Sequence, residues 1–321
     1  MAHNVETMMY AGQAPWHGLG TRVPQEVTSE EALRVAGLDW SVATVPVVAG
    51  VPDQVPVGVE GWKAVIRLAD RKALGVVGDR YRPIQNGEAF TFFDELVGEG
   101  QAIYHTAGAL DGGRRVWILA KLPGEVVVAR DDVTEKFLLL TNSHDGTTSL
   151  RMFFTPVRVV CQNTLNLALN QGMGEGIAIR HTASALARLN QAREALGIAN
   201  RFYDQFGVAA QVLVGAAYSE AQMKELSETI LPATEDGVST RTLRAREKVV
   251  DLFENGQGHA PIRGTAWAAL NAVAEFTDHF RTTRGADETT RAEARLTSTW
   301  FGSGAGLKRL AYQTIQRQLA A

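Results

Sequence analysis

Hydrophobic residues follow a strand pattern up to about residue 180 and a helical pattern after it. Short runs rich in Val, Ile and Phe, separated by Gly, Pro and Asp, are typical of strands. Apolar residues spaced three and four apart are typical of amphipathic helices. The strand-like runs lie at 40–48, 62–68, 73–78, 102–110, 114–122, 125–132, 135–142 and 149–160.

Two features interrupt the strand-like part. Residues 86–97 carry apolar side chains at helical spacing, and Asn86 is the natural N-cap for a helix there. Asp111-Gly112-Gly113 joins two strand-like runs and predicts a hairpin. Another helix is expected from Cys161 to Gly172.

The remainder of the chain predicts helices only. They are expected at 184–215, 219–231, 241–256, 265–283 and 291–319. Because strands and helices do not alternate strictly, an antiparallel sheet fits better than a doubly wound parallel one. We therefore predict an α+β fold with a mostly antiparallel sheet, a β-α-βββ-α core and a helical C-terminal part. The expected domains are a mixed core at 1–180 and a helical region at 181–321.

Composition indicates where in the cell the protein is expected. Apolar residues make up 45% of the 321 positions, which is ordinary for a globular protein. No apolar run reaches the roughly 18–20 residues that span a bilayer, and the N-terminus does not resemble a secretory signal. Cys161 is the single cysteine. These properties predict a cytoplasmic protein without membrane contact.

The motif Ser143-His144-Asp145 contains the residue types of a hydrolase triad. Adjacent side chains of a strand point to opposite faces, so these three cannot easily form a relay with one another. Asn142 and Gly146 favour a hairpin turn. Three interpretations stay open: a turn, a loop that contacts phosphate, and a catalytic loop.

Cofactor and metal motifs are not evident. The histidines show no metal-ligand spacing, so we expect no metal. Two stretches are rich in glycine, at residues 172–179 and 302–310, and neither is a P-loop. ATP hydrolysis is therefore disfavoured, and we expect no cofactor. Gly302, Gly304 and Gly306 precede a predicted helix and form either an anion site or a tight turn. Cys161, at a predicted helix start, is a candidate nucleophile in an enzymatic interpretation.

Basic residues lie beside aromatic ones in the strand-like part. Such interleaving can pair with phosphates and stack on bases. The net charge of −3 mildly disfavours nucleic-acid binding, although a local basic groove depends on the local field. The candidate nucleic-acid-binding residues are Arg80, Tyr81, Arg82, Arg114, Arg115, Trp117, Arg151 and Arg158.

Several long motifs resemble one family. PWHGLGT, GDRYRPIQNGEAF, TAGALDGGRRVWILAKL, LLLTNSHDGTTSLR, TPVRVVCQNTLNLAL and FGSGAGLK are similar to the phage/plasmid-like proteins, known as domain-of-unknown-function family 932. The resemblance covers nearly the whole chain. It implies residence on phages, prophages or plasmids, and it implies no particular activity.

A second resemblance concerns topology. The β-α-βββ-α order, with Asn86 and Phe90 on the helix, is similar to the core of phage single-strand-annealing recombinases. That resemblance implies ATP-independent binding of single-stranded DNA in a basic groove by a homo-oligomer.

We therefore expect a nucleic-acid-binding protein of a mobile element, with single-stranded DNA annealing in recombination as its mechanism and no enzymatic activity. The loop of Asn142, Ser143, His144 and Asp145 would position a DNA backbone or a partner subunit. One alternative is a hydrolytic or metal-assisted enzyme that uses His144, Asp145 and Cys161. Another is a protein that binds a host protein and so counters host defence.

Overall fold

The computed structural model describes most of the chain. The described residues are 5–11, 20–24, 27–50, 52–97, 103–129, 132–158, 163–164, 177–179, 181, 193–235, 237–282, 298 and 302–320. The expected helix at 161–172 falls outside them except for residues 163–164, which form a strand and not a helix, and residues 184–192 of the next expected helix also fall outside them.

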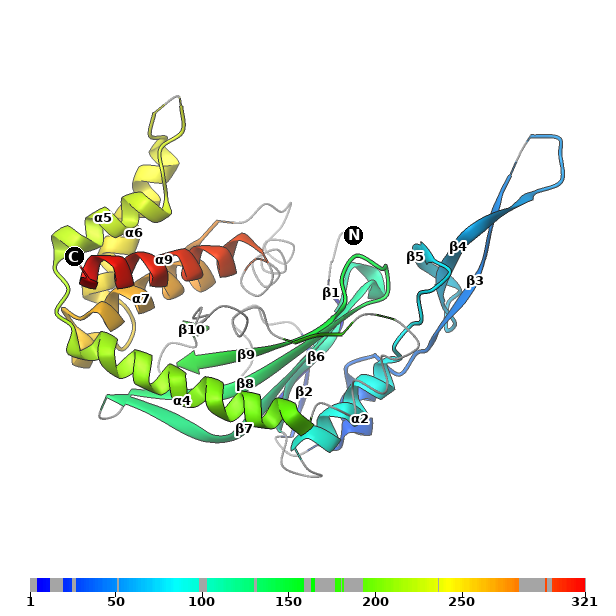
Figure 1. Cartoon of the computed structure of the whole chain (residues 1–321), viewed down its shortest axis with the longest axis horizontal. Coiled ribbons are helices and arrows are strands. Elements are labelled where there is room, and N and C mark those ends of the chain that lie inside the picture. Colours follow the sequence, from blue (N-terminus) through cyan, green and yellow to red (C-terminus); the bar gives the residue numbers. More distant parts are fainter. Residues whose placement is uncertain are drawn as a thin grey trace. The chain divides into compact units, whose positions relative to one another are not determined.

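The larger sheet has eight strands in the order β10-β9-β8-β7-β6-β1-β2, with β11 also paired to β9 (Figure 1). β1 runs parallel to β2, whereas β1 with β6, β6 with β7, and β9 with both β10 and β11 are antiparallel pairs. The strands are β1 (Val5–Ala11), β2 (Thr21–Val23), β6 (Ile103–Leu110), β7 (Arg115–Ala129), β8 (Asp132–Ser143), β9 (Leu150–Arg158), β10 (Asn163–Thr164) and β11 (Ile177–Ile179).

A smaller antiparallel sheet is formed by β3 (Val42–Ala49), β4 (Val57–Arg67) and β5 (Lys72–Gly78). β3 and β4 continue past the end of β5 as a two-stranded ribbon (Figure 1). Residues 52–62 are exposed throughout.

The remaining regular elements of the described residues are helices. The sheet pairing and the run of C-terminal helices confirm the predicted α+β class. Turn η1 (Asp111–Gly113) joins β6 to β7, as predicted. The helices are α1 (Ser29–Val35), α2 (Asn86–Val97), α4 (Arg193–Gly215), α5 (Glu220–Ile230), α6 (Thr240–Asn255), η2 (Ala260–Ile262), α7 (Ala266–Glu275), the π-helix η3 (Phe276–Phe280) and α9 (Ser303–Ala320).

Three local expectations were wrong. β7 is continuous through Pro123 and Gly124, where we expected two strands. Gly304 and Gly306 lie inside α9 and do not form a loop before it. Asn86 is the first residue of α2 and its side chain has other partners, so Glu88 instead accepts a hydrogen bond from the Gln85 N–H at 2.8 Å, as in half of a capping box.

The chain divides into two compact units, each made of several segments. The first unit comprises Met1–Pro123, Leu138–Phe153 and Gly176–Ile198. The second comprises Gly124–Phe137, Phe154–Glu175 and Ala199–Ala321, and it includes helices α5 to α9. β7, β8 and β9 each contribute residues to both units. The expected domain boundary near residue 180 stays a prediction.

Candidate functional site

The loop between β8 and β9 is a turn fixed by its own side chains. One carboxylate oxygen of Asp145 accepts hydrogen bonds from the Thr147 N–H at 2.9 Å, the Thr147 hydroxyl at 2.6 Å and the Ser143 hydroxyl at 2.5 Å. Gly146 supplies the positive φ of +75° that the turn requires. Burial raises the pKa of the Asp145 carboxyl, but the hydrogen bonds from Ser143 and Thr147 outweigh it and leave the pKa below its usual range.

The His144 ring is buried away from Ser143 and Asp145. Its Nε2 lies 2.9 Å from Oδ1 of Asn86, while the Asn86 amide nitrogen donates to the backbone oxygens of Leu38 and Trp40. These two carbonyls fix the amide orientation, so Oδ1 is the atom that faces the ring. His144 therefore carries its proton on Nε2 and presents a lone pair on Nδ1. That Nδ1 has no hydrogen-bond partner among the described residues.

Burial sets the protonation state of His144. Desolvation, with a smaller contribution from His181, lowers the pKa of His144 to about 3, against an opposing effect of Asp145. The ring is thus neutral at pH 7. Because the Ser143 hydroxyl bonds to Asp145, the three residues do not form a catalytic relay with one another. Cys161, the other residue of the enzymatic interpretation, lies outside the described residues.

Tyr81 connects this loop to His181. Its hydroxyl donates to the backbone oxygen of Ser143 at 2.9 Å, and its ring stacks on His181 with centroids 4.7 Å apart. Burial raises the pKa of Tyr81 and lowers the pKa of His181 to about 4. The Tyr81 ring is therefore engaged within the protein, and the expected stacking of a base on it does not fit this position.

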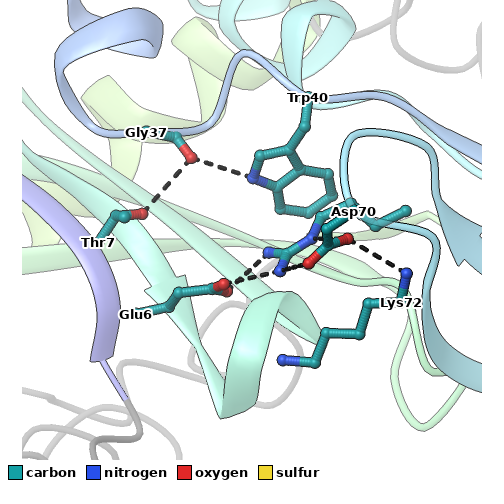
Figure 2. A network of polar contacts seen from close by, with 7 residues as sticks. Glu6, Thr7, Gly37, Trp40, Asp70 and Lys72 are labelled. Carbon is teal, nitrogen blue, oxygen red and sulfur yellow. Dashed lines mark hydrogen bonds and ion pairs between the residues drawn. The ribbon is translucent and has the colours of Figure 1, made fainter.

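A charged network that the sequence did not indicate lies in the same unit. Arg67 donates to both carboxylate oxygens of Glu6 at 2.7 Å and to both oxygens of Asp70 at 3.0 and 2.5 Å. The guanidinium lies 5.2 Å from the centroid of the Trp40 ring, whose N–H donates to the Gly37 oxygen (Figure 2). The hydrogen bond from Arg67 lowers the pKa of Asp70 to about 2.

These contacts anchor the smaller sheet. Gln85 accepts from the Val42 N–H and donates to the Val42 oxygen, both at 3.0 Å, at the start of β3. Gly75 and Val77 of β5 lie against Asp145 and Gly146 of the loop. The Arg67 network, Gln85 and the β8–β9 loop thus contact the strands β3, β4 and β5 and hold the smaller sheet in place.

The predicted nucleic-acid-binding residues other than Tyr81 fall into three groups. Arg80, Arg82, Arg114 and Arg151 are exposed. Arg115 is half-buried, and its Nε lies 3.9 Å from Asp111.

The last group comprises Trp117 and Arg158. Trp117 is 1% exposed and its N–H donates to the Thr106 hydroxyl, so it cannot stack on a base; residues 116–120 of β7 are all buried, which shows that both faces of the strand are covered there. Of Arg158, the structure describes the backbone in β9. Trp117 is therefore removed from the candidate set.

Two of these arginines interact with the loop, and two more flank its partner Tyr81 in the sequence. The Arg114 oxygen accepts from the His144 N–H at 2.7 Å, and Arg115 lowers the pKa of Asp145 through its charge. Arg80 and Arg82 flank Tyr81, which bonds to Ser143. Lys72 brings a further cation, because its ammonium group lies against Gly112 in η1.

The described residues hold neither a metal cluster nor a membrane-spanning helix. No group of three or more His, Cys, Asp or Glu side chains within them could hold a metal ion. None of the described helices is both long and apolar enough to cross a membrane.

Comparison with family models places most of the chain in a described family. A family model described as a domain of unknown function (DUF932) matches residues 73–300, which is more than half of the chain. No curated protein and no solved structure matches.

Proposed function

The chain belongs to the DUF932 family, and we propose that it is a nucleic-acid-binding protein of a phage or plasmid, which holds single-stranded DNA and anneals it without ATP. The observation that carries this proposal is that the β8–β9 loop interacts with Arg114 and Arg115 and with Tyr81, which Arg80 and Arg82 flank in the sequence. These arginines come from two segments about 30 residues apart in the sequence.

The environment of these arginines suits phosphate contact. Arg80 and Arg114 are exposed, and neither guanidinium has a hydrogen-bond or ion-pair partner among the described residues. Arg82 is exposed and donates to the backbone oxygens of Asp79 and Tyr81, which orients it without neutralising its charge. A guanidinium presents several N–H groups, so such a residue can still bind a phosphate oxygen.

Nearby carboxylates are largely engaged. Asp145 accepts its hydrogen bonds from within the loop, and Asp111 lies close to Arg115. The loop of Asn142, Ser143, His144 and Asp145 would then position the arginines, and the arginines would contact the DNA backbone. Phosphate contacts of this kind bind without reading the bases, which suits a protein that must leave bases free to pair.

The test is salt-dependent binding to a labelled single strand, measured by fluorescence anisotropy. Replacing Arg80, Arg82 and Arg114 together with alanine should weaken binding at least tenfold. It should also make the negative slope of log K against log salt shallower by about 2, because each phosphate contact to a single strand contributes about 0.7 to its magnitude. The matched control replaces Arg244 and Arg309, two exposed arginines of the helical unit, and should leave the slope unchanged.

Annealing needs a second assay. Two complementary labelled strands should pair faster with the wild-type protein than without it, in the absence of ATP. The triple variant should lose this acceleration. An absence of wild-type binding at about 50 mM salt, or equal slopes for the triple variant and the wild type, would refute the proposal.

A further inference from the structure

The outward face of the smaller sheet is apolar across all three strands. Residues directly opposite one another in neighbouring strands share a face. The pairing therefore places apolar or small residues together in three rows: Val45, Ala64 and Val76; Ala43, Ile66 and Ala73; and Trp62 opposite Gly78.

This face is open to solvent. Val45 is 39% exposed, Trp62 53% and Val76 55%. The opposite face holds the buried cluster of Val42, Val65, Leu74 and Val77, which packs against Trp40 and Tyr81. An antiparallel sheet with one solvated face normally alternates apolar and polar residues, whereas this sheet is apolar on both. An exposed apolar surface of this kind marks an interaction site.

The edges of the sheet do not favour strand addition. Pro46 lies in the edge strand β3 and cannot donate to a further strand. Leu74 is an extra residue in the edge strand β5, where the pairing shifts between Val65 and Ile66. A partner is therefore expected on the face of the sheet and not along its edge.

The chemistry of the face limits the partner. None of the residues in the three rows carries a charge, so the face offers nothing to a phosphate or to an acidic or basic peptide. The occupant must itself be flat and apolar.

The shape of the face is complementary to itself. The row of Val45, Ala64 and Val76 is low at its centre, because alanine lies between two valines. The row of Ala43, Ile66 and Ala73 is high at its centre, because isoleucine lies between two alanines. A two-fold axis that is parallel to these two rows, midway between them and in the plane between the two sheets turns one copy over onto the other. It would place each Ile66 in the partner's hollow at Ala64.

We propose that this face docks a second copy of the chain in a two-fold symmetric, sheet-on-sheet dimer. Such packing aligns the strands of two sheets about 10 Å apart with their inner side chains interlocked. In this arrangement Val76 of each copy faces Ala73 of the other. Three strands at a spacing of about 4.8 Å give a small interface, so the dimer belongs to the weak, reversible class.

Sedimentation velocity of the full chain without DNA, from about 1 to 200 µM, tests the dimer independently of nucleic-acid binding. The wild type should shift from monomer to dimer over this range. Val76→Asp should weaken association at least tenfold, because it places two unpaired carboxylates in the interface. Val212→Asp, on an exposed position of α4, is the matched control and should associate as the wild type does.

A mixing experiment tests the orientation. Ala73→Lys alone should also weaken association. In an equimolar mixture, a Val76→Asp chain and an Ala73→Lys chain can pair so that the introduced carboxylate faces the introduced ammonium group, while the symmetry-related contact stays native. The mixture should therefore recover the dimer, with circular dichroism showing that each variant is folded.

Three outcomes would overturn the proposal. The first is a wild-type protein that stays monomeric at about 200 µM. The second is a Val76→Asp variant that associates like the wild type. The third is a mixture of folded variants that stays monomeric. If Val76→Asp leaves the mass unchanged but weakens DNA binding, the face belongs to nucleic acid instead.

Discussion

The two units bury polar side chains in different ways. In the first unit, the buried ring of His144 is neutral and bonds to a neutral amide, and its Nδ1 has no partner among the described residues. In the second unit, Lys308 and Asp278 are both buried, and the ammonium nitrogen lies 2.8 Å from the carboxylate. A neutral network is vulnerable to gaining a proton, whereas a buried ion pair is vulnerable to losing a partner.

The largest expected effect comes from breaking the ion pair. Lys308→Met leaves the Asp278 carboxylate buried and without its ammonium partner, which typically costs about 3–5 kcal/mol. Urea unfolding at pH 7 would measure the loss. The double variant Lys308→Met with Asp278→Leu should recover most of it, because both charges are then gone. A single variant as stable as the wild type would show that the pair is not essential to the second unit.

The second effect is a loss of stability in mild acid, which comes from the first unit. The folded pKa values of His144 and His181 are about 3 and 4, below the unfolded value of 6.5. The unfolded chain therefore binds protons that the folded chain does not, and stability falls as pH falls below about 6.5. Each histidine contributes about 1.4 kcal/mol per pH unit between pH 6 and 5, so the two together contribute about 2–3 kcal/mol.

A variant separates the contribution of His144. In His144→Gln, the amide nitrogen can still donate to Asn86 but cannot titrate. Urea unfolding between pH 6 and 5 should show a weaker dependence of the unfolding free energy on pH than in the wild type, because the variant takes up about one proton fewer when it unfolds. This interval lies above the range in which Asp70 and Asp145 titrate, because both carboxyl pKa values are lowered. An identical slope in both proteins would contradict a neutral, buried His144.

Local signals in the sequence predicted much of the fold. Asp111-Gly112-Gly113 forms the expected turn between β6 and β7, and Thr28 and Ser239 cap their helices through bonds to N–H groups three positions away. Each of these depends on residues within a few positions of one another. The strands from β3 to β9 followed in the same way from alternation and from Pro and Gly, whereas β1 and β2 lie before residue 40, where no strand was expected.

The site could be predicted only in part, because its contacts join distant segments. Asn86 bonds to His144 across 58 positions, and Arg67 bonds to Glu6 across 61. No local pattern marks such a pair. Trp117 was expected on an exposed face because basic residues precede it, but residues 116–120 are all buried, so both faces of β7 are covered there, which no local pattern shows.

The smallest effect compares the two units directly. The hydroxyl of Thr28 accepts from the Glu31 N–H in the first unit, and the hydroxyl of Ser239 accepts from the Thr242 N–H in the second. Thr28→Ala and Ser239→Ala should each cost about 1 kcal/mol, because each leaves one helix N–H without its cap. Since β7, β8 and β9 contribute to both units, we expect a single cooperative transition whose midpoint shifts equally in the two variants. Circular dichroism and tryptophan fluorescence, followed through the same urea titration, would check this. Two separate transitions, each moved by one variant alone, would show that the units unfold independently despite the strands they share.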